Sequence, residues 1–118
     1  MVEIKYDDIK QTYINAAILH REASYNGKHK IANKQYKILK NIYEQIEKKI
    51  VSKNLLIDLL KHDNLSVRSW AAAHMLGMNY ETTKAEEELI KITSMPGMIG
   101  FSAEMTLKVW KQQGYLKF

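Results

Sequence analysis

The chain has 118 residues, 46% of them apolar, which is enough for one domain with its own core and argues against disorder. It has no cysteine, and no apolar run approaches the roughly 20 residues of a membrane span, so a disulfide framework, a cysteine zinc site and a spanning helix are excluded. The net charge of +5 is uneven, because residues 28–53 hold eight lysines and two acids.

The first helix is expected over residues 6–23. Asp7 and Asp8 fall in its first turn, where carboxylates favour the positive end of the helix dipole. The Asn26-Gly27 pair after it suits a left-handed cap. The opening stretch, MVEIKYDDIK, contains acids and no apolar core of signal-peptide length, so we expect a cytoplasmic protein. Helical spacing predicts that the buried stripe consists of Ile9, Tyr13, Ala16, Ala17 and His20.

The second helix is expected over residues 30–50. Its charged side, which includes Lys30, Lys34 and Lys37, is expected to face solvent. Asn33 is placed among the core-side residues, where a hydrogen bond to a loop would offset its poor helix propensity, and a ligand contact is the alternative. Spacing of three and four residues predicts an apolar side made of Ile31, Gln35, Ile38, Leu39, Ile42, Ile46 and Ile50.

Four further helices are expected over residues 53–61, 66–76, 84–94 and 102–113. Asn64 or Ser66 caps the fourth, Thr83 and Glu86 form a capping box for the fifth, and Ser102 caps the sixth. Residues 55–77 have the plan helix, short turn, helix, glycine, and residues 83–114 repeat it. We therefore predict one all-α domain over residues 1–118, with six helices in three antiparallel pairs that stack as a right-handed α-α superhelix. A compact bundle is the alternative.

Residues 62–76, HDNLSVRSWAAAHML, resemble the core of a HEAT repeat in the turn aspartate Asp63, the Val67-Arg68 pair and the small residues at the helix crossing. More narrowly, ANKQY at residues 32–36, VRSWAA at 67–72 and FSAEMTLKVW at 101–110 resemble a family of small bacterial HEAT-like domains of unknown function. This resemblance implies a HEAT-like superhelix and a bacterial origin, and it implies no catalytic residues. Related small helical domains occur among immunity proteins of bacterial toxin systems.

Arg68 is interpreted as a structural residue that ties the turn to a neighbouring repeat by pairing with Asp63, Asp58 or Glu104, with an anion contact as the alternative. Trp70 and Trp110 are interpreted as core residues. The four histidines, His20, His29, His62 and His74, lack metal-ligand spacing, and no nucleophile or phosphate-loop motif occurs. We therefore expect neither an enzyme nor a metal or cofactor.

Two surfaces are candidates for binding a partner. The stretch after residue 94 places Met95, Met98 and Phe101 around a proline turn, and exposed methionines there would suit a protein partner. The function predicted from the repeat architecture is therefore that of a protein-interaction module. The most specific version of this prediction is an immunity protein that neutralises a toxin. The alternative is sequence-independent nucleic-acid binding through the lysines of the second helix. Two observations count against nucleic-acid binding. The lysine side of the second helix carries acids and no arginine. A bias toward lysine is also typical of proteins from an AT-rich genome.

Overall fold

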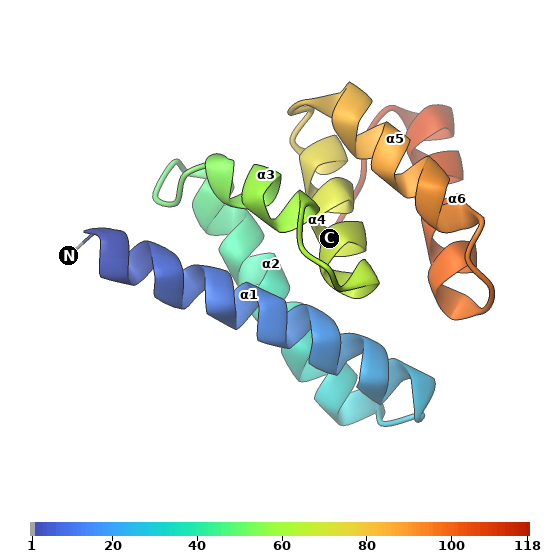
Figure 1. The fold of residues 1–118 in the computed structure, drawn as a ribbon, viewed down its shortest axis with the longest axis horizontal. Helices are drawn as coiled ribbons and strands as arrows, with labels where there is room; N and C mark the ends of the chain where they lie inside the picture. The colour runs from blue at the N-terminus through green and yellow to red at the C-terminus, as the bar shows by residue number, and fades with distance from the viewer. Residues whose placement is uncertain (1) are drawn as a thin grey trace. The chain divides into compact units, whose positions relative to one another are not determined.

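The computed structural model describes residues 2–118, with side chains from Lys5 onward. This part of the chain is all-helical and contains no strand, which confirms the predicted fold class (Figure 1). The chain divides into two compact units, Met1–Leu59 and Leu60–Phe118. The helices are α1 (Val2–Tyr25), α2 (His29–Glu47), α3 (Asn54–Leu60), α4 (Leu65–Gly77), α5 (Thr82–Thr93) and α6 (Met98–Gln113).

In the first unit, α1 and α2 pack side by side and run in opposite directions (Figure 1). The predicted α1 stripe is confirmed at its centre, where Tyr13, Ala16 and Ala17 are buried. The two alanines present little bulk, so α2 can approach α1 closely. The buried side of α2 consists of Ala32, Gln35, Leu39, Ile42, Tyr43 and Ile46.

Two predicted core positions of α2 are wrong. Ile31 is exposed because the buried stripe starts at its neighbour Ala32 and continues at three- and four-residue spacing. Ile50 is 60% exposed because the helix has already ended. Lys49 adopts a left-handed conformation there, with φ of 65°, so the chain turns away before Ile50 could extend the stripe.

The first helix starts earlier than predicted. Because α1 begins at Val2, Asp7 and Asp8 lie beyond its first turn, and the predicted interaction with the end of the helix dipole is wrong. The predicted cap at its other end is confirmed. Gly27 has φ of 72°, and the Lys28 N–H donates to the Ala23 carbonyl at 2.8 Å, as in a Schellman motif.

In the second unit, α5 packs against both α4 and α6. Asn64 caps α4, since its Oδ1 accepts from the N–H groups of Ser66 and Val67 at 2.8 and 3.2 Å. Of the two predicted caps, Asn64 and Ser66, the first is therefore confirmed. The predicted capping box of α5 is wrong, because the helix begins at Thr82 and Thr83 therefore lies within its first turn. The core of this unit consists mainly of Val67, Ala71, Ala72, Met75, Leu76, Ala85, Leu89, Ile92, Ile99, Ala103 and Leu107.

The sixth helix also begins earlier than predicted, at Met98, so Ser102 is inside the helix and exposed rather than a cap. The residue that precedes it, Gly97, has φ of 79°. Gly100 then lies so close to the preceding turn that an added Cβ would meet the carbonyl oxygen of Met95 at 1.9 Å. A glycine at this position is therefore what allows α6 to start directly after the Met95 turn.

His74 of α4 is fully buried in the second unit. Its ring lies edge-on to Phe118 at a centroid distance of 4.7 Å and tilted against Trp70 at 5.5 Å. Burial lowers the pKa of His74 from 6.5 to about 3, because the apolar surroundings disfavour the charged imidazolium. The folded protein therefore holds this histidine neutral at every mildly acidic pH.

This burial predicts a loss of stability on acidification. Between pH 6.5 and about pH 3 the unfolded chain binds a proton at His74 and the folded chain does not, so the free energy of unfolding falls as the pH falls. From pH 7.5 to pH 5 we expect His74 to account for a loss of about 2 kcal/mol in urea unfolding. His74→Leu should flatten this dependence by the same amount, and an unchanged slope in the variant would contradict the assignment.

Candidate interaction surfaces

Arg68 organises the turn between α3 and α4 from within the second unit. Its Nη1 donates to the carbonyl oxygens of His62 at 2.9 Å and Asp63 at 3.2 Å. Its Nε donates to Oε2 of Glu88 on α5 at 3.1 Å, where both side chains are partly buried. The fork of the guanidinium thus ties a turn to a neighbouring helix, which agrees with the structural interpretation.

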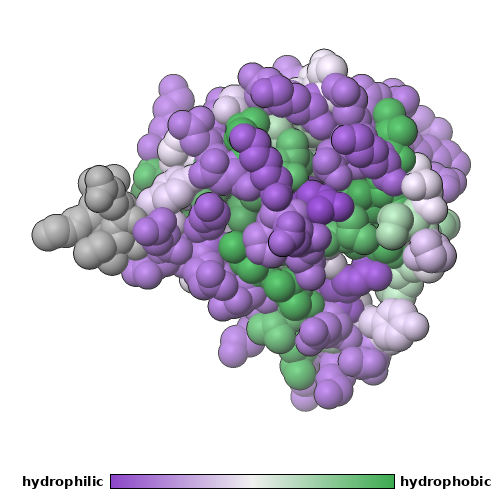
Figure 2. All heavy atoms as spheres, in the orientation of Figure 1, coloured by the Kyte–Doolittle hydropathy of each residue, from purple (hydrophilic) through white to green (hydrophobic). Residues whose placement is uncertain are grey.

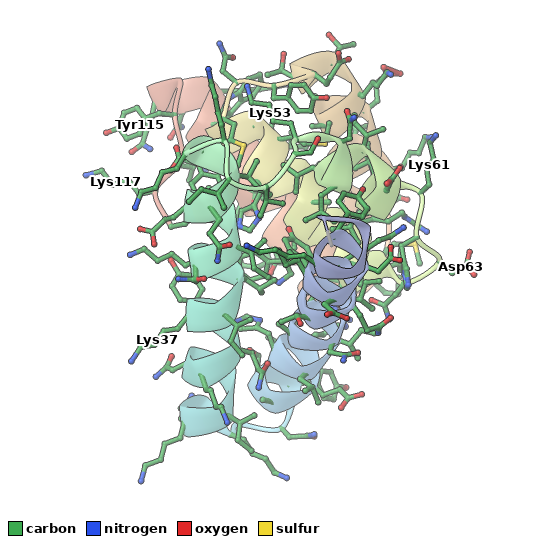
Figure 3. All side chains as sticks on the ribbon, turned by 90° about the vertical axis from the view of Figure 1, so that its left-hand side faces the viewer. Lys37, Lys53, Lys61, Asp63, Tyr115 and Lys117 are labelled. Atoms are coloured by element: carbon green, nitrogen blue, oxygen red, sulfur yellow. The ribbon has the colours of Figure 1, made fainter. Side chains whose placement is uncertain are left out.

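The predicted ion-pair partners of Arg68 are wrong, however. Glu88 accepts from Arg68, and Asp63 contributes its backbone carbonyl and not its carboxylate. Asp63 is exposed, with its side chain turned outward (Figure 3). Asp58 accepts a hydrogen bond from the Tyr6 hydroxyl in the first unit. Glu104 is exposed on α6.

The other residues given structural roles have mixed outcomes. Asn33 is exposed, so its predicted place among core-side residues is wrong, and its neighbour Ala32 occupies the buried position. Trp70 and Trp110 are both half-buried. His62 belongs to the turn, where its Nδ1 accepts from the Asn64 N–H at 3.0 Å.

An exposed apolar stripe runs along α6. Met98 is 48% exposed, Phe101 63% and Met105 39%, and their spacing of three and four residues places them on one side of the helix. Met95, in the turn before the helix, is exposed as well. We call these four residues the α6 apolar face. Figure 2 shows that the visible surface is mainly hydrophilic, with apolar residues gathered in patches.

The α6 apolar face lies on the opposite side of the helix from its buried residues. The core side of α6 consists of Ile99, Gly100, Ala103 and Leu107, and at 100° per residue this set is centred about half a turn away from Met98, Phe101 and Met105. The helix is therefore apolar on two sides, of which one packs in the unit and the other faces solvent.

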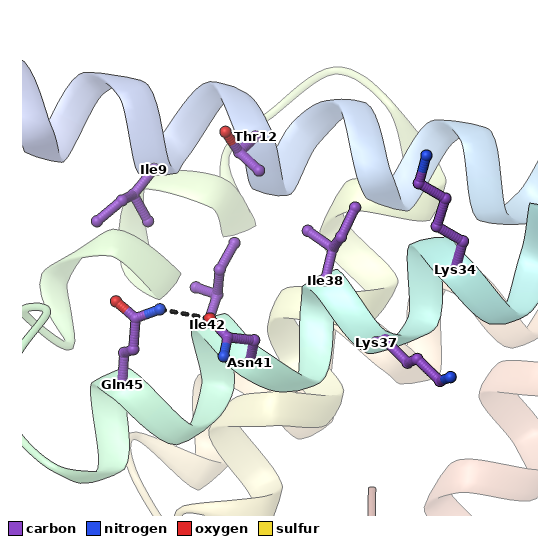
Figure 4. A pocket seen from close by; sticks show the side chains of 8 residues that line it. All are labelled: Ile9, Thr12, Lys34, Lys37, Ile38, Asn41, Ile42 and Gln45. Carbon is purple, nitrogen blue, oxygen red and sulfur yellow. Dashed lines mark hydrogen bonds between the residues drawn. The ribbon is translucent and has the colours of Figure 1, made fainter.

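The first unit carries a groove between α1 and α2, with a volume of about 440 Å³. Figure 4 shows Ile9 projecting from α1 toward α2 and Ile38 projecting from α2 toward α1 at different positions along the groove, while Lys34 leans toward α1 and Lys37 points away from α1. At one end, Nε2 of Gln45 donates to Oδ1 of Asn41. The groove is lined by Ile9, Thr12, Lys34, Lys37, Ile38, Asn41, Ile42 and Gln45.

Lys30, Lys34 and Lys37 are all exposed on α2, as predicted, and Lys37 projects from the helix into solvent (Figure 3). Among the residues that the structure describes, none of these three lysines forms an ion pair with a carboxylate. Two of them, Lys34 and Lys37, line the groove, and Lys30 does not.

Reasoning from sequence missed two parts of these surfaces. Met105 follows Phe101 by one helical turn and extends the α6 apolar face, and a helical projection of the final helix begun at residue 98 would have found it. The groove was missed because Ile9 and Ile38 were both assigned to a closed core. Both are only half-buried, and periodicity alone does not distinguish an apolar groove from a buried seam.

Within the part of the chain that is described, no helix combines the length and apolarity needed to cross a membrane. Nor do three or more histidine, aspartate or glutamate side chains come together there in an arrangement that could hold a metal ion. No protein-family model, curated protein or solved structure matches the chain.

Proposed function

We propose that this protein is a non-enzymatic interaction module that binds a partner protein through the α6 apolar face. The observation that carries the proposal is the exposure of Met98, Phe101 and Met105 in a single row on a helix whose opposite side is packed. Isolated exposed apolar residues are common on protein surfaces, whereas apolar residues gathered in one contiguous row are typical of surfaces that bind a partner.

Covering this face supplies part of the binding energy of a specific complex. Fully burying a phenylalanine or methionine side chain contributes about 1.5–3 kcal/mol. Because these side chains are already half-covered, the three together supply about 2–4 kcal/mol, a substantial share of the roughly 8 kcal/mol of a micromolar complex. Methionine adapts its shape to the partner, and phenylalanine provides a rigid anchor.

In its sharpest form, the proposal is that the module is a bacterial immunity protein that binds and neutralises a toxin. The support is the resemblance of residues 62–76 and 101–110 to small HEAT-like domains, together with an apolar docking face on a small helical unit. The net charge of +5 is concentrated in residues 28–53, outside α6, so it places no strong requirement on the charge of the partner surface that contacts the α6 apolar face.

The proposal is tested by comparing baits in extracts of the native host. Phe101→Ser should lower recovery of the partner by at least tenfold, because the central anchor of the face is removed. Ile50→Ser is the matched control, since Ile50 is exposed to nearly the same degree but lies outside α6. Equal recovery with both variants would overturn the role of the face. Identification of the captured partner as a toxin encoded beside this gene would establish the immunity form.

Nucleic-acid binding is the second candidate function. It is favoured by one observation, the row of exposed lysines at positions 30, 34 and 37 on α2. Lysines on one face of a helix can follow a phosphate backbone, and such binding weakens steeply with salt. This candidate requires all three lysines to contribute alike, whether or not they line the groove.

A further inference from the structure

The groove between α1 and α2 combines an apolar floor with a basic rim. Ile9, Ile38 and Ile42 form its apolar part. Ile42 is buried, and Ile9 and Ile38 are half-buried, so a bound group would cover apolar surface that is now in contact with water. Lys34 and Lys37 provide positive charge at the edge, and none of the lining residues is acidic.

The apolar floor and the basic rim together favour some classes of ligand over others. A phosphodiester backbone offers no aliphatic groups for the isoleucine floor, and unstacked bases bind preferentially to aromatic side chains, none of which lines the groove. A segment of protein that carries leucine or isoleucine beside glutamate or aspartate matches both parts, because its apolar side chains fit the floor and its carboxylates reach the lysines.

The dimensions of the groove also suit a peptide. The lining residues of α2 extend from Lys34 to Gln45, about 16 Å along the helix axis at 1.5 Å per residue. A helical ligand of about three turns has the same length and presents apolar side chains at three- and four-residue spacing. The amide groups of Asn41 and Gln45 lie toward the other end from Lys34, where they can pair with polar groups of the ligand (Figure 4).

We propose that the α1–α2 groove binds an acidic amphipathic helix of a partner protein, with apolar side chains against Ile9 and Ile38 and carboxylates at Lys34 and Lys37. This inference rests on the proposed function, in that the ligand belongs to a protein partner. It concerns a different unit from the α6 apolar face, so a variant of one surface leaves the other intact.

The test uses the full chain and labelled synthetic helices of leucine, alanine and glutamate, with leucine at helical spacing. Binding is followed by fluorescence anisotropy, and its location by amide chemical shifts. We expect saturable binding with shifts at the groove residues, and at least tenfold weaker binding of the same helices with lysine in place of glutamate. The double variant Lys34→Gln/Lys37→Gln should weaken binding by about three- to tenfold.

The matched control is Lys30→Gln/Lys48→Gln, which removes the same charge from exposed lysines that do not line the groove. Unchanged binding in this control supports the proposal. Equal loss in the two double variants would show attraction by net charge alone and overturn it. No binding of the acidic helices at low salt, or preferential binding of duplex DNA, would overturn it as well. None of these outcomes alters the expected effect of Phe101→Ser on partner recovery.

Discussion

Arg68→Met is expected to lower the free energy of unfolding by about 2–3 kcal/mol, which corresponds to a fall of roughly 10 °C in the melting temperature. The variant keeps much of the aliphatic length but removes three hydrogen bonds. It leaves the partly buried carboxylate of Glu88 without its counter-charge, and the carbonyl groups of His62 and Asp63 without their donor. Unfolding followed by circular dichroism in urea measures the change.

Two further substitutions separate the hydrogen-bonding geometry of the Arg68 guanidinium from the effect of removing a positive charge. Arg68→Lys should still cost about 1–2 kcal/mol, because a single ammonium group cannot reproduce the divergent Nε and Nη1 contacts. Lys84→Met removes a lysine whose pairing with Glu81 is exposed, and it should change stability by less than about 0.5 kcal/mol. A loss for Arg68→Met no larger than that for Lys84→Met would remove the structural role of Arg68.

Gly100→Ala should destabilise the protein by about 2–3 kcal/mol, although alanine is ordinarily the better residue inside a helix by about 1 kcal/mol. The added Cβ would lie 1.9 Å from the carbonyl oxygen of Met95 and 3.2 Å from that of Thr93. Both are backbone atoms, so no side-chain rotation relieves the overlap. The turn that carries Met95 must move away from α6 instead, and thermal unfolding measures the cost.

Gly27→Ala is the comparison for this variant. No atom lies within 4 Å of an added Cβ at Gly27, and its cost of about 1 kcal/mol comes only from the left-handed backbone, with φ of 72°. The two variants therefore separate steric overlap from backbone strain. Equal or increased stability of Gly100→Ala would show that α6 does not approach the Met95 turn this closely.

Reasoning from sequence located all six helices, because apolar spacing reports which side of a helix faces a core. Tyr13, Ala16 and Ala17 illustrate this, since their spacing alone placed them correctly. The helix ends were less predictable. The start of α6 depends on Gly100 lying against a carbonyl five residues earlier in the sequence, and the N-terminal boundary of α5 on a left-handed residue, Glu81, that carries no sequence signature of its own.

The surfaces were predictable only in part. Met95, Met98 and Phe101 were predicted as candidates from the proline turn and are exposed, whereas Met105 required the observed start of α6. For Arg68, the residue type predicted that the guanidinium would tie the turn to a neighbouring element, but it did not predict Glu88 as the partner. Glu88 is twenty residues away on α5, and only the packing of α4 against α5 brings the two side chains together.

Site-specific photo-crosslinking in the native host tests whether a partner protein covers the α6 apolar face. A photoreactive side chain is placed at position 101 in one variant and at the similarly exposed position 50 in another. We expect a discrete crosslinked protein from position 101 and none from position 50. Adducts from position 50 alone, or an identical spread of adducts from both positions, would contradict it.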